Sequence, residues 1–107
     1  MFTEKQPAVY IIASKRNGTI YIGVTSALYD RISTHKAKGF AGFSSKYNCK
    51  LLVWYEHHAT MEQAIRREKQ IKEWQRTWKL RLIETMNPDW LDLHEQIDFV
   101  GTLVNSD

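Results

Sequence analysis

Two apolar runs near the start of the chain, residues 9–13 and 20–24, are separated by a turn signal. Both runs are rich in valine, isoleucine and tyrosine, which favour strands, and Asn17-Gly18 between them is typical of a hairpin turn. A loop with an even number of residues makes one face of the hairpin wholly apolar. That face consists of Val9, Ile11, Ala13, Ile20, Ile22 and Val24. We therefore predict that Tyr10 and Tyr21 lie together on the opposite face.

The register of this hairpin is left open by the pattern. A two-residue loop would pair Tyr21 with Ser14, whereas a longer loop would pair Tyr10 directly with Tyr21. The longer loop is favoured because it would let the two tyrosines share one site. Gly23 lies on the tyrosine-bearing face in either case, and we expect it to leave open space there.

The rest of the chain alternates between helical and strand patterns. The expected elements are a helix over 27–38 capped at Thr25-Ser26, a loop over 39–48, a strand over 51–55, a helix over 61–73 and a helix over 77–86. Thr60 and Gln63 form a capping box for the second helix, and Asn87-Pro88 ends the third. Residues 94–107 have weak periodicity, so we expect one domain over residues 1–93 and a loosely attached tail.

Composition describes one globular domain. The chain has 107 residues, 43% of them hydrophobic and 25% charged, which is long enough for one core. No apolar run approaches the roughly 18 residues of a membrane span, and residues 1–8 lack the apolar segment of a signal peptide. The single cysteine, Cys49, is interpreted as a strand residue in a reducing cytoplasm.

Charge is distributed unevenly along the chain. The formal net charge is +3, but the four acidic residues from Asp92 onward have no Lys or Arg among them. Residues 1–91 therefore carry all 15 basic residues against the other 8 acidic residues, a net charge of +7. A basic body with an acidic tail is consistent with a polyanionic partner, although a solvated basic surface explains the same numbers.

Glu68 interrupts an apolar stripe. In the expected second helix the inward-facing positions are Met61, Ala64, Glu68 and Ile71, at the spacing of one helical face. A carboxylate at such a position must be paired or bound to metal, because burying it alone is costly. The metal-free alternative is an ion pair with Arg67, Lys72 or Arg31.

Arg31 and His35 are four residues apart and share one stripe of the expected first helix. Taken singly, both are explained as solvated helix residues, and Tyr10 and Tyr21 as ordinary strand aromatics. The joint spacing of these residues with Glu68 is the informative feature.

The sequence resembles the GIY-YIG nuclease superfamily from about Ala8 to Leu93. The resemblance rests on Val9-Tyr10-Ile11, Tyr21-Ile22-Gly23, Arg31, His35, Arg67-Glu68-Lys69-Gln70-Ile71-Lys72, Trp74, Arg76, Trp78-Lys79 and the stretch from Asn87 to Leu93. It looks like the small stand-alone bacterial branch, which is similar to the N-terminal nuclease domain of the DNA-repair excinuclease. The family implies an α+β fold with a three-stranded antiparallel sheet flanked by helices, and metal-dependent phosphodiester hydrolysis.

The resemblance also assigns roles. Glu68 would hold one divalent metal, Mg²⁺ or Mn²⁺, while Tyr10 and Tyr21 would position or deprotonate the attacking water. Arg31 would steady the phosphate, and His35 would assist proton transfer or contact the phosphate. The sequence departs from the family pattern in two places. Val9 stands where the GIY motif that gives the family its name has glycine. The asparagine that the family has near the end of the domain has only an approximate match.

That approximate match is Asn87, an additional candidate that helix termination also explains. The leading hypothesis is a metal-dependent endonuclease, with nucleic acid as the partner and DNA favoured over RNA. A non-catalytic nucleic-acid-binding module with the same fold is the first alternative. An interaction module built on Trp74 and Trp78 is the second.

Overall fold

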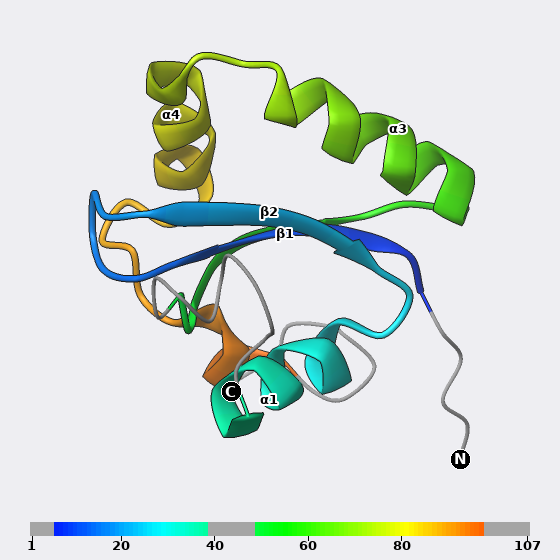
Figure 1. Cartoon of the computed structure of the whole chain (residues 1–107), viewed down its shortest axis with the longest axis horizontal. Helices are drawn as coiled ribbons and strands as arrows, with labels where there is room; N and C mark the ends of the chain where they lie inside the picture. Colours follow the sequence, from blue (N-terminus) through cyan, green and yellow to red (C-terminus); the bar gives the residue numbers. More distant parts are fainter. Residues whose placement is uncertain (1–5, 39–48, 98–107) are drawn as a thin grey trace, which may run out of the picture.

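A three-stranded antiparallel sheet lies between two helical layers in the computed structural model, which describes residues 6–38 and 49–97 (Figure 1). The strands are β1 (Ala8–Ala13), β2 (Ile20–Thr25) and β3 (Leu51–His57), in the order β2-β1-β3. The helices are α1 (Leu28–Lys38), α3 (Met61–Lys72), α4 (Arg76–Met86) and the short 3-10 helix η1 (Leu93–Gln96). The expected α+β architecture with a small flanked sheet is therefore confirmed.

The register of the β1–β2 hairpin lies midway between the two registers that the sequence left open. Tyr10 pairs with Gly23 and Ile12 with Tyr21, so both expected pairings are wrong, while the even loop length is confirmed. Residues 15–18 form the loop, closed by a hydrogen bond of 2.9 Å from Gly18 N–H to the Lys15 carbonyl. Asn17 takes a φ of 59°, in the left-handed region that asparagine tolerates better than most residues.

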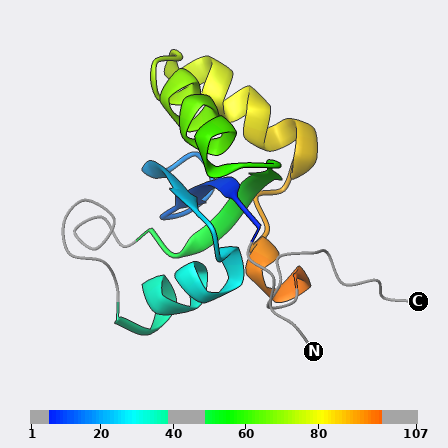
Figure 2. The same cartoon turned by 90° about the vertical axis from the view of Figure 1, so that its right-hand side faces the viewer.

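The two faces of the sheet carry separate cores, as the alternation predicts. One face, here the isoleucine face, packs residues such as Val9, Ile11 and Ile22 against α3 and α4. The other, the tyrosine face, packs Tyr10 and Ile12 against α1 and the segment after α4. Figures 1 and 2 show α3 and α4 on one side of the sheet, and α1 and η1 on the other. The predicted placement of both tyrosines opposite Ile11 and Ile22 is confirmed.

The expectation of open space at Gly23 is wrong. A Cβ at this position would lie 2.5 Å from both Cζ and the hydroxyl oxygen of Tyr10. The observed register explains the crowding, because it sets Gly23 directly across from Tyr10. Glycine at this position therefore makes room for the buried phenol ring.

Most element ends follow the capping signals in the sequence. The hydroxyl of Thr25 accepts a hydrogen bond of 3.0 Å from Ala27 N–H at the start of α1. Thr60 accepts one of 3.2 Å from Gln63 N–H at the start of α3. The third strand is two residues longer than expected, and the expected loop over 39–48 lies outside the described residues. Among the described residues, no helix has the length and apolar character needed to cross a membrane.

The segment after Leu93 is attached more firmly than expected. Leu93 and Ile97 are 6% and 3% exposed and belong to the tyrosine-face core. The expectation of a loosely attached tail is therefore wrong for residues 94–97, and residues 98–107 lie outside the described part of the chain. A single turn of 3-10 helix is too short to produce a visible hydrophobic period, which explains the error.

Cys49 is buried just before β3 and is not part of the strand itself. Its side chain is 2% exposed, and Sγ donates to the Thr19 carbonyl at 3.6 Å. Burial raises the pKa of the Cys49 thiol, so the neutral form is favoured. This environment fits a packing residue better than a reactive thiol.

Candidate active site

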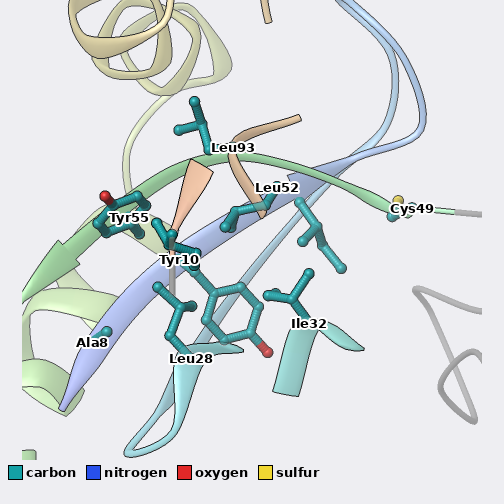
Figure 3. Packing of buried hydrophobic residues seen from close by; sticks show 10 residues of the cluster. Ala8, Tyr10, Leu28, Ile32, Cys49, Leu52, Tyr55 and Leu93 are labelled. Atoms are coloured by element: carbon teal, nitrogen blue, oxygen red, sulfur yellow. The ribbon is translucent and has the colours of Figure 1, made fainter. Parts of the chain in front are cut away.

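Tyr10 is the buried centre of the candidate site. Tyr10 is only 1% exposed. Figure 3 shows its side chain extending from β1 toward α1, beside Leu28 and Ile32. Burial raises the pKa of Tyr10 well above its ordinary value, because a phenolate would lose its hydration there. The phenol of Tyr10 therefore keeps its proton at neutral pH in the metal-free protein.

Three further candidates act electrostatically on the Tyr10 phenol. The cationic Arg31 lowers the pKa of Tyr10 but does not overcome burial, while Tyr21 and Glu68 raise that pKa further. These residues come from α1, β2 and α3, whereas Tyr10 comes from β1. Arg31 is exposed and Tyr21 is half-buried, so the group runs from the interior to the surface. The fold thus gathers four of the sequence candidates from four elements.

Glu68 reaches this group from the helical layer on the isoleucine face. The helix α3 packs against β2 and β1 through its buried residues Ala64 and Ile71. Because β2 is an edge strand, a side chain on α3 can extend past it toward the tyrosine face. The influence of Glu68 on the Tyr10 phenol agrees with this placement.

The Glu68 carboxylate forms an ion pair within its own helix. Its Oε2 lies 2.8 Å from Lys72 Nζ, and the Glu68 side chain is only 12% exposed, against 50% for Lys72. One of the alternatives left open by the sequence, pairing with Lys72, is therefore present. Lys72 is half exposed and its ammonium can turn toward solvent, so a divalent cation can compete with it for the carboxylate.

The side chains near Tyr10 suit a divalent metal that is held by a single protein carboxylate. Among residues 6–38 and 49–97, no cluster of three or more His, Cys, Asp or Glu side chains is placed to hold a metal ion. Mg²⁺ is often bound by one or two carboxylates, with water and substrate phosphate completing its shell. Glu68 can serve as such a single protein ligand, so the residues present suit a metal shared with the substrate.

The two remaining residues predicted from the sequence are His35 and Asn87. His35 lies in α1, but its side chain is outside the described part of the structure. Asn87 is 4% exposed at the C-terminus of α4. Its amide donates to the carbonyls of Val53 and Leu91, at 3.1 and 2.8 Å, and accepts from Leu91 N–H at 3.0 Å. These hydrogen bonds give Asn87 a structural role at the end of α4, as helix termination predicts.

Sequence reasoning missed Tyr55, which lies directly across from Tyr10 on β3. Tyr55 is 9% exposed in the same core, and burial raises the pKa of its phenol as well. A β-bulge at Val53 shifts the alternation of β3, because Ile11 pairs with Trp54 whereas Ile12 pairs with Leu52. Without knowledge of that bulge, the face of Tyr55 could not be read from the sequence.

The segment from Asp92 to Ile97 braces α1 and was also missed. Asp92 forms an ion pair with Lys36 and accepts hydrogen bonds from Leu52 and His94 N–H groups, at 3.2 and 3.1 Å. The His94 ring packs on Tyr29 at 4.6 Å between centroids, and its Nε2 is 3.2 Å from Ser33 Oγ. These contacts fix the helix that carries Arg31.

Comparison with known proteins identifies the class. The family model described as the GIY-YIG catalytic domain matches residues 6–81, which include Tyr10, Tyr21, Arg31 and Glu68. The chain therefore belongs to the GIY-YIG family.

Two relatives cover most of this chain. The UPF0213 protein SH2523 of Staphylococcus haemolyticus (strain JCSC1435) is 37% identical over 76 residues, 71% of this chain and 92% of the relative. A UPF0213 protein of Bacillus pumilus (strain SAFR-032) is 28% identical over 92 residues, 86% of this chain and 94% of the relative. No solved structure matches significantly.

Proposed function

We propose that this chain is a metal-dependent endonuclease that hydrolyses phosphodiester bonds, with DNA favoured as the substrate. The observation that supports this most strongly is the convergence of Arg31, Tyr21 and Glu68 on the buried phenol of Tyr10. Packing alone does not require a cation, a carboxylate and two phenols from four elements at one place. Membership of the GIY-YIG family gives this group a nuclease context.

Arg31 is assigned to the phosphate. Its side chain is exposed, permanently cationic and able to donate two parallel hydrogen bonds to phosphate oxygens. Because α1 is braced by Asp92 and His94, the guanidinium is carried on a fixed helix. Charge that develops on the phosphate during hydrolysis would be stabilised by this preorganised cation.

The two tyrosines are assigned different parts. Tyr10 keeps its proton at neutral pH, so its hydroxyl can donate a hydrogen bond to a phosphate oxygen or to the attacking water. Tyr21 is half-buried at the rim, where its hydroxyl can accept a hydrogen bond from that water. We expect His35 to assist proton transfer or to contact the phosphate.

Glu68 is assigned as the protein ligand of one Mg²⁺ or Mn²⁺. A bound divalent ion would supply Lewis acidity and lower the pKa of a coordinated water. Glu68 suits this role because its mostly buried carboxylate lies beside Lys72, a half-exposed cation that can turn away to solvent. The lysine is then free to turn outward to solvent or to a phosphate.

Nucleic-acid binding is expected to be electrostatic and tolerant of sequence. Residues 1–91 have a net charge of +7, and release of counterions makes the affinity for a polyanion fall as salt rises. Deleting residues 98–107, which contain two acids and no Lys or Arg, should leave binding intact. Affinity that stays flat between low and moderate salt would contradict this assignment.

Cleavage of supercoiled plasmid tests the function directly. We expect nicked and linear products with Mg²⁺ or Mn²⁺ and none with EDTA. Glu68→Gln, which keeps the side-chain shape, should lower cleavage by about 100-fold or more. Its unfolding free energy without metal should change by less than about 1 kcal/mol, because loss of the ion pair with Lys72 is offset by no longer burying a charged carboxylate.

One result would overturn the endonuclease assignment, and a second would overturn the role given to Glu68. The first is wild-type protein that binds DNA but does not cut it with either metal, which would favour a non-catalytic nucleic-acid-binding module. The second is cleavage by Glu68→Gln at the wild-type rate, which would remove Glu68 from the chemistry.

A further inference from the structure

Two of the four tryptophans lie at the surface of the helical layer on the isoleucine face. Trp54 and Trp90 are 4% and 3% exposed, whereas Trp78 is 51% exposed and Trp74 is half-buried. A shallow pocket of about 270 Å³ is lined by Trp74, Trp78, Arg81, Leu82 and Thr85. Core packing accounts for the first two tryptophans, but it gives no reason for the exposed indole of Trp78.

One wall of this pocket is held in place within the fold. The guanidinium carbon of Arg67 lies 5.4 Å from the ring centroid of Trp74, and Arg67 is in turn ion-paired with Glu56 at 2.9 Å. The Trp74 and Trp78 rings meet edge to face, with centroids 6.1 Å apart and an angle of 74° between their planes. Because Trp74 is fixed by this chain of contacts, a ligand would not have to order it.

The polar groups around the pocket suit an anionic ligand. Arg81 is exposed, and within the described residues it forms no ion pair. The two helices that form the layer, from residue 61 to residue 86, carry seven Lys and Arg residues against four Glu residues. A phosphate group beside an aromatic ring would match this combination of Arg81 and Trp78.

We propose that the pocket formed by Trp74, Trp78, Arg81, Leu82 and Thr85 binds one unpaired base of a nucleic-acid strand. The nucleic-acid nature of the ligand rests on the proposed function, and the proposal adds a preference for substrates with single-stranded segments. A volume of about 270 Å³ is just below the range of roughly 300–1,000 Å³ typical of small-molecule pockets, so one planar ring system fits. The base would stack on Trp78, and Arg81 would contact the neighbouring phosphate.

The pocket is separate from the residues assigned to chemistry. The helix α4 covers the isoleucine face (Figures 1 and 2) and packs against β3. Tyr10 and Tyr21 belong to the other face. A base bound here would anchor the strand and leave the phosphodiester group at Arg31 undisturbed. The pocket is therefore a second contact that selects substrates, and the candidate active site performs the hydrolysis.

Binding in EDTA separates this proposal from catalysis. The affinity of the full chain is measured for oligothymidylate of about 12 nucleotides, for an abasic strand of the same length and for duplex DNA. We expect Trp78→Ala to weaken oligothymidylate binding about tenfold while changing abasic-strand and duplex binding less than about twofold. In the wild type, oligothymidylate should quench tryptophan fluorescence more than the abasic strand does.

Two control variants accompany this measurement. Trp78→Phe retains an aromatic face and should recover most of the lost affinity. Leu91→Ala removes a side chain that is 55% exposed outside the pocket and should have no effect. Unfolding curves check that all variants remain folded, and Trp78→Ala should lose some stability because its indole is half buried and packs edge to face on Trp74.

Equal weakening of all three ligands by Trp78→Ala would overturn the proposal, and so would unchanged affinity for oligothymidylate. A wild-type chain that binds bases through Trp78 but never cuts DNA would instead refute the endonuclease function and leave the stacking site in place. The two failures are therefore distinguishable.

Discussion

The two faces of the sheet differ in what their packing explains. On the isoleucine face, hydrocarbon side chains such as Ile11, Ile22 and Ile71 are buried, and their burial alone accounts for the arrangement. On the tyrosine face, the core also contains the phenols of Tyr10 and Tyr55, whose ionisation burial opposes. A core that keeps ionisable groups where apolar ones would suffice indicates a second requirement besides stability.

The two helical layers show the same contrast. The brace on α1 consists of polar contacts, among them the Lys36–Asp92 ion pair and the Ser33–His94 hydrogen bond. The helices α3 and α4 instead carry many of their polar side chains at exposed positions, although Glu68 acts on Tyr10 and Arg67 pairs with Glu56 of β3. Substitution of the charged residues that act on Tyr10, Arg31 and Glu68, should therefore change catalysis with little loss of stability.

The largest expected effect is a loss of plasmid cleavage on substituting Arg31, compared with another exposed arginine, Arg66. Arg31→Ala should lower plasmid cleavage by about 100-fold or more, because it removes the cation assigned to the phosphate. Arg66→Ala is the matched control, since Arg66 lies on α3 with a side chain 74% exposed and only a surface ion pair to Glu62. Cleavage rates of the two variants are compared at equal protein concentration. A similar loss of cleavage in the two variants would mean that the rate depends on total positive charge and not on the position of Arg31.

The next effect concerns the segment after Leu93. Ile97→Ala should lower the free energy of unfolding by about 2–3 kcal/mol, because a side chain 3% exposed leaves a cavity in the tyrosine-face core. Gln96→Ala, at an exposed neighbouring position, should be nearly neutral. Urea unfolding measures both. A loss below about 0.5 kcal/mol for Ile97→Ala would restore the view of this segment as a loose tail.

A smaller effect tests the contact between Gly23 and Tyr10. Gly23→Ala should lower the free energy of unfolding by about 1–2 kcal/mol, since the new methyl group would overlap the Tyr10 ring. The control is Gly18→Ala, whose methyl group would meet the Ser14 hydroxyl, the Lys15 side chain and the Lys15 carbonyl oxygen, so its cost cannot depend on Tyr10.

Thermal and urea unfolding compare both glycine variants in the wild-type and Tyr10→Ala backgrounds, and only the cost of Gly23→Ala should depend on the background. In a Tyr10→Ala background the cost of Gly23→Ala should largely disappear, because the overlapping ring is gone. An equal cost in both backgrounds would show that Gly23 is required for a reason other than the ring.

The smallest effect is a change in alkaline stability. The pKa of Tyr10 is raised on folding, so above about pH 10 the unfolded chain releases this proton first and stability falls. Tyr10→Phe has no such proton. Between about pH 8 and pH 10.5, the wild type should therefore lose up to about 1 kcal/mol more than the variant. Parallel stability curves for the two proteins would show that the phenol is not buried in solution.

Much of the fold follows from local patterns. Alternation along residues 9–13 and 20–24 assigned every side chain of the hairpin to its correct face, because that assignment depends only on an even loop. Capping at Thr60 fixed the start of α3 in the same way, through a contact three residues away. The candidate site residues Tyr10, Tyr21, Arg31 and Glu68 were predicted from their joint spacing, and in the structure the last three act electrostatically on the phenol of Tyr10.

Only the tertiary structure decided the hairpin register, the face of Tyr55 and the attachment of residues 94–97. All even loops leave the same side chains on each face, so alternation cannot distinguish between the registers, and a single bulge resets the alternation of β3. The burial of Tyr10 against Gly23, and the interaction of both Glu68 and Arg31 with its phenol, also depend on how four elements meet. The sequence by itself determined which residues face which side, because that depends on local geometry. Long-range packing determined which of them meet, because each such contact joins residues far apart in the chain.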